Sequence, residues 1–208
     1  MREHHLKLNP AKSELLVIPG CPSINHNLTV QRSSTTLKPT WTARNLGVIL
    51  DDSLTFIDHI STTARSCRFI LYNIKKIRPY LTEQATQILV QALVISKLDY
   101  CNSLLSGLPA SSIKPLQMIQ NAAAHLVFNQ PKRTHVTPVF ISLHWLPVAA
   151  RIKFKALMLT YKILSGIAPS YLSSLLKAYV PSRNLQSISD RRLVVTTQHG
   201  SRSLSRTF

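Results

Sequence analysis

The segment Ile57–Ile77, with the sequence IDHISTTARSCRFILYNIKKI, decides the fold because its apolar residues recur at steps of three and four. The recurring positions are Ile57, Ile60, Ala64, Cys67, Leu71, Ile74 and Ile77. This spacing places them along one face of a helix of about five turns. Pro79 then ends the helix, because a proline ring removes the backbone donor that the next turn requires.

Two more helices are expected after Pro79. Thr82 can cap the first of them, with Glu83 near its positive end. The apolar side of that helix is expected to hold Ala85, Ile88, Leu89, Ala92 and Ile95. Ser111 or Ser112 can cap the second. Its buried face is expected to hold Leu116, Ile119, Ala123 and either Leu126 or Val127.

The last third of the chain continues this helical pattern. A turn-rich stretch and a short apolar piece, Val139–Leu143, lead to a long helix from about Val148 to Leu164. Gly166 stops that helix, and Pro169 suits the first turn of a short final one. The chain is therefore predicted to be mainly α-helical.

The segment before residue 56 has a different pattern. Short apolar runs at Glu14–Ile18, Leu28–Val30 and Leu46–Leu50 predict three strands. Pro19-Gly20 closes the first, and Asp51-Asp52 ends the third. These strands predict a small antiparallel β element with long turns in front of the helices.

The charge balance indicates a polyanionic partner. The 208 residues hold 25 Lys and Arg against 8 Asp and Glu, and the isoelectric point is about 10.4. No acidic residue lies between Asp58 and Glu83, or between Asp99 and Asp190, so ion pairs within a helix cannot balance the charge. A phosphate backbone would balance it. The alternatives are solvated helix faces, or a soluble basic protein such as those of the ribosome.

Several other classes of function lack their sequence signals. Cys21, Cys67 and Cys101 are odd in number and far apart, which disfavours a disulfide framework and a zinc site. The histidines show no metal-ligand spacing, and there is no P-loop, GxGxxG or GxSxG motif. With no signal peptide and no membrane-length apolar segment, we expect an intracellular protein of the nucleus or cytoplasm, without a membrane partner.

A series of phrases resembles one protein family. LNPAKSEL at 8–15 is similar to LN-x-x-K-S/T-E, and NLGVILD at 45–51 is similar to LGV-x-LD, of LINE-type (non-LTR) retrotransposon reverse transcriptases. The phrases YNIKKIRP at 72–79, LDYCNSLLSGLP at 98–109 and LQMIQNAAA at 116–124 resemble the region behind the palm of these enzymes. HWLPVAARIKFK at 144–155 completes the series, which runs in order along nearly the whole chain.

The resemblance implies a division of the chain into three parts. Residues 1–55 would be a palm remnant with a primer-grip-like hairpin, and 56–180 a thumb-like and following helical region. Residues 181–208 are polar, rich in Ser and Arg and weakly periodic, and this composition itself predicts a basic polar tail that is unfolded alone. Both ends are expected to be truncated, so that the chain is a fragment of the parent enzyme.

The resemblance also implies roles for single residues. Lys12 matches the motif D lysine, which in the family assists the pyrophosphate leaving group. The resemblance predicts nucleic-acid contacts for the hairpin residues Leu46, Gly47 and Val48. The locally unbalanced positive charge predicts phosphate contacts for Arg65, Arg68, Lys75, Lys76, Arg78, Lys132, Arg133, Arg151, Lys153 and Lys155. Arg151 and Lys155 are one helical turn apart and are expected to span adjacent phosphates. Trp145 and Tyr161 are expected in the core, although aromatic rings can also stack on bases.

Catalysis is not expected of this chain. The paired-aspartate motif of the family does not occur in it, and His125 stands where the family usually has Arg. Asp51-Asp52 is interpreted as a strand-ending turn before a helix, because adjacent residues of a strand point to opposite faces. We therefore expect no cofactor in this chain, although the parent enzyme uses Mg²⁺.

The function expected from these features is that of a reverse transcriptase fragment. As an RNA-directed DNA polymerase piece without its catalytic aspartates, it would retain at most sequence-indifferent binding of RNA or an RNA–DNA hybrid. One alternative is a solenoid-like helical module that binds a protein partner. Another is a translated pseudogene fragment without a selected function, in which exposed sheet edges would lower solubility.

Overall fold

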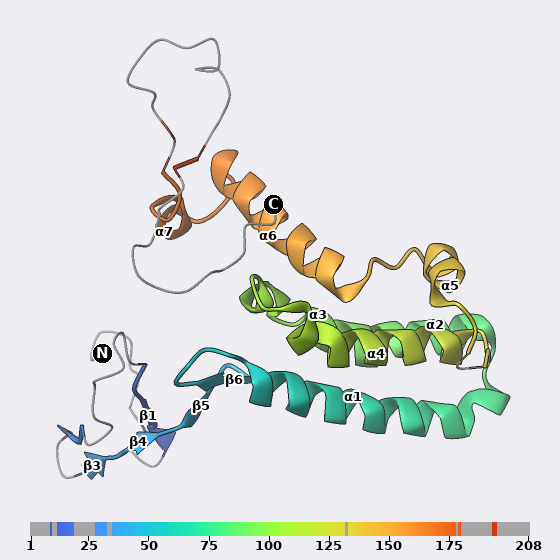
Figure 1. Cartoon of the computed structure of the whole chain (residues 1–208), viewed down its shortest axis with the longest axis horizontal. Coiled ribbons are helices and arrows are strands. Elements are labelled where there is room, and N and C mark those ends of the chain that lie inside the picture. Colours follow the sequence, from blue (N-terminus) through green and yellow to red (C-terminus); the bar gives the residue numbers. More distant parts are fainter. Residues whose placement is uncertain are drawn as a thin grey trace.

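The computed structural model describes residues 9, 12–18, 28–32, 35–131, 133–177, 179 and 193–194. Short strands occupy the first part of the described chain, and helices make up most of the remainder (Figure 1). The prediction of a mainly helical fold that follows small antiparallel β parts is confirmed at this level.

The strands form three separate pairs instead of one small sheet. β2 (Val30–Arg32) and β3 (Thr35–Leu37) are antiparallel. β1 (Leu15–Leu16) pairs in parallel with β4 (Pro39–Thr40), so the expectation of an entirely antiparallel element is wrong at this point. Parallel strands need a connection of a dozen residues or more. The segment 17–38, which contains the β2–β3 hairpin, supplies that connection.

A tight hairpin joins the strands to the helices. β5 (Thr42–Asn45) and β6 (Val48–Asp51) are antiparallel, with Asn45 opposite Val48. The two turn residues, Leu46 and Gly47, both have positive φ, 46° and 85°, as a type I′ turn requires. The predicted strand over 46–50 therefore begins two residues later, because its first two positions form the turn.

The loop after β6 is organised by Asp51. Its carboxylate accepts hydrogen bonds from the backbone N–H of Thr55 at 3.0 Å and of Phe56 at 3.4 Å, and from the Thr55 hydroxyl. The Asp52 carboxylate accepts one from the Ser53 hydroxyl at 3.0 Å. These bonds end the strand and lead into the first helix, which confirms the interpretation of Asp51-Asp52 as a strand-ending turn.

The helix α1 spans Ile57–Ile77, as its apolar spacing predicts. The buried residues are Ile60, Ala64, Cys67, Leu71 and Ile74, whereas the two terminal isoleucines are exposed. A short 3₁₀ turn, Arg78–Tyr80, follows and contains Pro79.

The second helical stretch runs without a break through α2 (Glu83–Val90), a π-helical turn (Gln91–Ile95) and α3 (Ser96–Asp99). The predicted cap is confirmed, since Thr82 Oγ1 accepts the N–H of Ala85 at 3.1 Å. A 3₁₀ turn over Asn102–Leu105 ends this part of the chain.

The predicted apolar side of this stretch is only partly correct. Ile88 and Ala92 are exposed, and the buried residues are Thr86, Val90, Val94, Ile95 and Leu98. Thr86 tolerates burial because its hydroxyl donates to the Thr82 carbonyl at 2.8 Å. The π turn over Gln91–Ile95 adds a residue to the spacing and so changes which of the positions after Val90 face the core.

The helix α4 (Ala110–Val127) begins one residue before the serines that were expected to cap it. Pro109, in an extended conformation, is the N-cap residue, and no side chain makes a capping hydrogen bond. The cap prediction is therefore wrong, but the predicted apolar face is confirmed. Its buried residues are Leu116, Ile119, Gln120, Ala123, Ala124, His125 and Val127.

Two glutamines of α4 position the chain that follows. α5 (Val136–Leu143) and α6 (Val148–Leu164) are joined by a short link. Gln120 Nε2 donates to the Leu146 carbonyl in this link at 2.8 Å, and the Val148 N–H donates to Gln117 Oε1 at 2.9 Å. Gln117 thus satisfies a backbone donor at the start of α6, which has no side-chain cap of its own.

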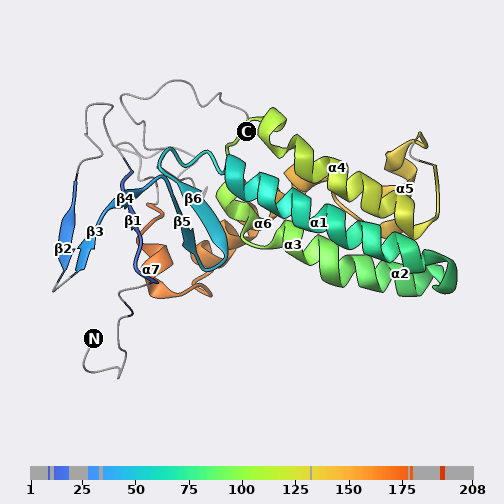
Figure 2. The same ribbon diagram turned by 90° about the horizontal axis from the view of Figure 1, so that it is seen from below.

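The helices form a bundle around one core. α1 lies between α4 and the α2–α3 stretch, and α2 also packs against α4 (Figure 2). α6 crosses these helices and contacts α4, α3 and the 3₁₀ turn, while α7 (Ser170–Ser173) follows α6. None of the helices in the described part of the chain has the length and apolar character needed to cross a bilayer.

The two aromatic residues that were expected in the core have different environments. Trp145 is buried, and its ring centroid lies 6.4 Å from that of Phe140, which confirms the prediction. Tyr161 is exposed, so its prediction is wrong. The reason is that α6 buries only Val148 and Ile152, near its start, and the residues of its second half are half-buried or exposed.

The predicted tail over 181–208 lies outside the described residues, apart from Leu193 and Val194. The backbone N–H of Val194 donates to the Lys177 carbonyl at 2.9 Å.

Candidate nucleic-acid interface

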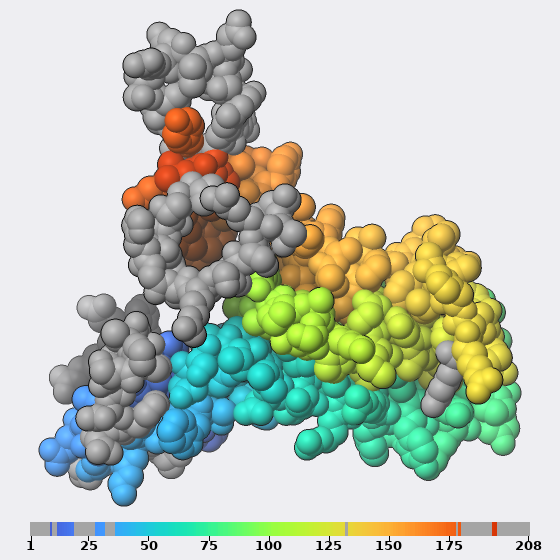
Figure 3. All heavy atoms as spheres, viewed as in Figure 1, coloured from blue at the N-terminus to red at the C-terminus, as the bar shows by residue number. Residues whose placement is uncertain are grey.

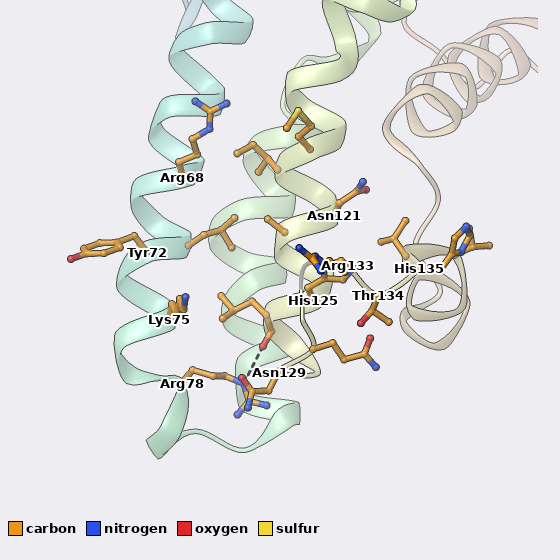
Figure 4. Close-up of a pocket in the computed structure, with 18 of the residues that line it drawn as sticks. Arg68, Tyr72, Lys75, Arg78, Asn121, His125, Asn129, Arg133, Thr134 and His135 are labelled. Atoms are coloured by element: carbon orange, nitrogen blue, oxygen red, sulfur yellow. Dashed lines mark hydrogen bonds between the residues drawn. The ribbon is translucent and has the colours of Figure 1, made fainter.

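A basic pocket of about 1230 Å³ lies between the second half of α1, α4 and the loop that leads to α5 (Figure 4). Its basic lining residues are Arg68, Lys75, Arg78, His125, Arg133 and His135. Uncharged polar groups and apolar side chains such as Leu71, Met118 and Ile119 form the rest of the wall, and the described lining contains no Asp or Glu. The charged part of this wall favours an anionic group over a cationic one.

Three of the predicted nucleic-acid contacts meet in this pocket. Arg68 and Lys75 are seven residues apart on α1, which places them on one side of the helix, two turns apart. Arg133 comes from the α4–α5 loop, more than fifty residues later in the sequence. All three are exposed and can reach a bound anion. Lys132, which was predicted with them, lies outside the described residues.

Arg78 also lines the pocket, but its guanidinium is engaged within the protein. Nε donates to the Leu126 carbonyl at 3.1 Å (Figure 4), and Nη2 donates to the Val127 carbonyl at 2.8 Å. Nη1 donates to the Leu81 carbonyl at 2.9 Å. The carbonyls at the end of a helix carry partial negative charge that would repel a phosphate. Arg78 covers those at the end of α4, so we revise its predicted role from phosphate contact to support of the pocket.

His125 is a pocket residue that was not predicted as a contact. Its side chain is 8% exposed, and its Nε2 atom is buried with no hydrogen-bond partner among the described residues. A buried polar nitrogen without a partner is unfavourable by about 1–3 kcal/mol. The position had a sequence signal, since it is the one at which the resembling family usually has Arg.

The loop that carries Arg133 is held by backbone hydrogen bonds. Asn129, with a φ of 49°, ends α4, and its N–H donates to the Leu126 carbonyl at 3.3 Å. The Gln130 N–H donates to the His125 carbonyl at 2.9 Å, and the Thr134 N–H donates to Pro131 at 3.1 Å. Arg133 therefore extends from a folded turn, and its Cα has a fixed place beside the pocket.

A second set of basic residues lies on the outer side of α1. Arg65 and Lys76, both predicted contacts, are exposed there together with Phe69 and Tyr72. Lys76 Nζ lies over the Tyr72 ring, 4.6 Å from its centroid. The two aromatic residues were not predicted as contacts, although the helical period of α1 places them opposite its buried face.

The hairpin residues predicted to grip a primer have three different environments. Leu46, at the tip, is 84% exposed, and Gly47 forms the turn with it. The Val48 side chain is buried in the core, so it is unable to touch a nucleic acid, and we correct that prediction. The hairpin adjoins the start of α1 (Figure 1), whereas the residues that line the pocket belong to the second half of this helix.

The predicted contacts of α6 lie outside the pocket. Arg151 binds Asp99 through Nε and Oδ1 at 2.7 Å and through a second contact, Nη2 to Oδ2. Its charge was expected to be unbalanced because no acidic residue is near in sequence, and Asp99, 52 positions earlier, balances it. Arg151 therefore does not pair with Lys155 to span two phosphates. Lys153 is exposed and Lys155 is half-buried.

Lys12, the predicted remnant of motif D, is exposed beside β1. Its backbone N–H donates to the Asn9 carbonyl at 3.2 Å. Two positions later, the Glu14 carboxylate accepts the N–H of Arg44 at 3.0 Å, which joins the β1 segment to β5. The described residues contain no group of three or more His, Cys, Asp or Glu side chains placed to hold a metal ion.

The pocket and the outer face of α1 offer cations, amide groups and aromatic rings. These groups suit the recognition of phosphates and bases, which requires no bond to be made or broken. Comparison of the chain with models of protein families, with curated proteins and with solved structures finds no match in any of the three.

Proposed function

We propose that this chain is a nucleic-acid-holding part of a LINE-type reverse transcriptase and binds RNA or an RNA–DNA hybrid without sequence preference. The observation that carries the proposal is the gathering of Arg68, Lys75 and Arg133 in one pocket without a lining carboxylate. The ordered resemblance of the sequence to this family supports it independently.

Electrostatics favour a phosphate backbone as the partner. Arg68 and Lys75 are about 10 Å apart along α1, because seven residues rise 1.5 Å each. One nucleic-acid strand can therefore contact both with phosphates that are a few nucleotides apart. Arg133 adds a cation from the opposite wall, and Arg78 neutralises the helix end between them. No base edge needs to be read for such contacts, so the binding is indifferent to sequence.

The arrangement also gives the hairpin a place in the proposed complex. The 21 residues of α1 span about 30 Å. A hybrid that lies along this helix would have the Leu46 tip near one end and the pocket near the other. The Tyr100 hydroxyl donates to the Leu46 carbonyl at 2.6 Å, so the tip is fixed to the helical body. In this proposal Leu46 contacts the primer, and Val48 anchors the hairpin.

We expect no polymerisation by this chain. Phosphoryl transfer by two metal ions requires carboxylates about 4 Å apart that point at one site. Asp51 is engaged with Thr55 and Phe56, and Asp99 with Arg151. The protein, given a primed RNA template, nucleotides and Mg²⁺, should leave the primer unextended. Extension would overturn this part of the proposal.

The binding itself is tested with a labelled RNA–DNA hybrid across a salt series. The logarithm of the affinity should fall linearly with the logarithm of salt concentration. Lys75→Gln and Arg133→Gln should each reduce the slope by about one. Lys162→Gln, an exposed lysine near the end of α6, is the matched control and should leave the slope unchanged. A soluble, folded protein that does not bind would contradict the proposal and leave the resemblance as ancestry only.

One observation favours a second candidate function. Phe154, Leu157 and Tyr161 are exposed at steps of three and four on α6, so an apolar stripe faces outward. A helical interaction module would use this stripe to bind an amphipathic helix of a partner protein. Such binding would depend little on salt and would be lost in Leu157→Asp. Steep salt dependence without an effect of Leu157→Asp favours the nucleic-acid proposal.

A further inference from the structure

The outer face of α1 combines aromatic rings and cations in a way that the core does not explain. Arg65, Phe69, Tyr72 and Lys76 follow one another at steps of four, three and four. At 100° per residue they lie within a narrow arc of the helix. This aromatic-basic face is opposite the buried residues of α1 and is not covered by another described element (Figure 2).

The two rings are accessible to a ligand. Phe69 is 67% exposed and Tyr72 is 58% exposed. Their Cβ atoms are expected to be 5–6 Å apart, as for any pair three residues apart on a helix. Figure 4 shows the Tyr72 side chain extending away from α4, and the space-filling view shows α1 along the border of the helical body (Figures 3 and 4). Exposed apolar surface that is rimmed by polar residues is typical of an interaction site.

The charges around the rings indicate the kind of partner. Arg65 precedes the two rings and Lys76 follows them, and Lys76 Nζ is 4.6 Å from the Tyr72 ring centroid. No acidic residue occurs between Asp58 and Glu83. Alternating cations and π-faces match the phosphates and bases of a nucleic acid.

We propose that the aromatic-basic face stacks unpaired bases of a single-stranded nucleic acid whose phosphates lie on Arg65, Lys76 and the neighbouring pocket. This inference rests on the proposed function and specifies that this side of the protein binds a single-stranded nucleic acid. Arg68, Tyr72 and Lys75 of this helix all line the pocket, so the aromatic-basic face borders on it. A strand can therefore place its bases on the rings while its backbone follows the cations.

A single strand fits this face better than a duplex does. Bases inside a duplex are stacked on each other and offer only their edges in the grooves. Unpaired bases offer whole faces, and every base has one, so stacking on Phe69 and Tyr72 requires no particular sequence. The hybrid and the single strand would then occupy neighbouring surfaces. The cations of the pocket would lie near the point where the single-stranded part of the nucleic acid meets the hybrid.

The test compares a labelled single-stranded RNA of about 12 nucleotides with an abasic strand of the same length and with a duplex. Phe69→Ala and Tyr72→Ala should each weaken binding of the RNA by about fivefold or more. The salt slope should stay unchanged, because no phosphate contact is removed. Binding of the abasic strand and of the duplex should change less than twofold. The conservative variants Phe69→Tyr and Tyr72→Phe should retain binding.

Tyr161→Ala, an equally exposed tyrosine on α6, is the matched control and should have no effect. Circular dichroism checks that each variant keeps its helices. Unchanged RNA affinity in folded Phe69→Ala and Tyr72→Ala would overturn the inference, as would equal losses for RNA, abasic strand and duplex. The proposed function would survive either result if Lys75→Gln and Arg133→Gln still reduced the salt slope. It would fail separately if the wild-type protein bound none of the three.

Discussion

Arg151 on α6 and Asp99 at the end of α3 form a bidentate ion pair, although 52 positions separate them in the sequence. Asp99 Oδ1 also accepts a hydrogen bond from Asn102 Nδ2 at 3.4 Å. The side chains are 20% and 32% exposed, so solvent shields the pair only in part. The pair joins the crossing helix α6 to the bundle at the place where the second helical stretch ends.

Arg151→Met should lower the free energy of unfolding by about 1–2 kcal/mol, because it leaves a half-buried Asp99 without its partner. Urea unfolding measures the loss. A double-mutant cycle with Asp99→Asn should give a coupling energy of about 1 kcal/mol. Lys153→Met, an exposed neighbour on α6, should change stability by less than about 0.5 kcal/mol. Additive effects of Arg151→Met and Asp99→Asn would show that the pair contributes nothing.

Arg78→Lys should destabilise the protein by about 2 kcal/mol while keeping the charge. The planar guanidinium donates to three carbonyls, and an ammonium group does not reproduce that geometry. Thermal or urea unfolding measures the change. Lys75→Gln is the contrasting variant, since it should alter the salt dependence of binding and leave stability nearly unchanged. If Arg78→Lys were as stable as wild type, the proposed support of the α4 end by Arg78 would be wrong.

The helices that are fixed by local signals could be predicted from the sequence. The spacing of Ile60, Ala64 and Cys67 gives α1 its buried face, and the Thr82 cap and the stop at Gly166 follow from residue chemistry. Apolar spacing predicted the buried face of the stretch after Thr82 only in part. A π-helical turn shifts the helical period there, and Thr86 can be buried because its hydroxyl donates a hydrogen bond to the Thr82 carbonyl. A local pattern does not reveal either event.

The candidate site was predictable as a set of residues but not as an arrangement. Charge alone selected Arg68, Lys75 and Arg133, and packing of α1 against α4, which continues into the loop that carries Arg133, brings them to one pocket. A different contact, that of α6 with α3, gives Arg151 an acidic partner that sequence distance concealed. Whether a basic residue is free or engaged depends on contacts between elements, which a pattern along the chain does not encode.

Leu46→Asn should stabilise the protein by about 0.5–1 kcal/mol. Leu46 has a φ of 46° and an exposed side chain, so it carries the strain of a left-handed conformation without a packing gain. Asn-Gly is the favoured pair for a type I′ turn. Gly47→Ala should have the opposite effect, a loss of about 1 kcal/mol, because Gly47 has a φ of 85°. Urea unfolding of both variants decides the matter, and a stabilising Gly47→Ala would contradict the assigned turn.

Stability should fall on acidification through His59. Burial lowers the pKa of His59 below its usual value of 6.5, and its Nδ1 accepts the backbone N–H of Ile49 at 3.5 Å. Between the lowered folded pKa and 6.5, the unfolded chain binds the proton and the folded protein does not. The stabilisation of the folded state by neutral His59 is therefore complete above pH 6.5, and it is lost as the pH falls toward the pKa of His59 in the folded protein.

The measurement is urea unfolding at several pH values between neutral and mildly acidic, for wild type and for His59→Gln. Wild type should lose stability across this window, and His59→Gln should lose less, because glutamine does not titrate and its side-chain oxygen can still accept the Ile49 N–H. His135→Gln, which changes an exposed histidine of the pocket loop, is the control and should follow wild type. Parallel stability curves for wild type and His59→Gln would mean that His59 titrates alike in the folded and unfolded chains, and the hairpin would not depend on its neutral form.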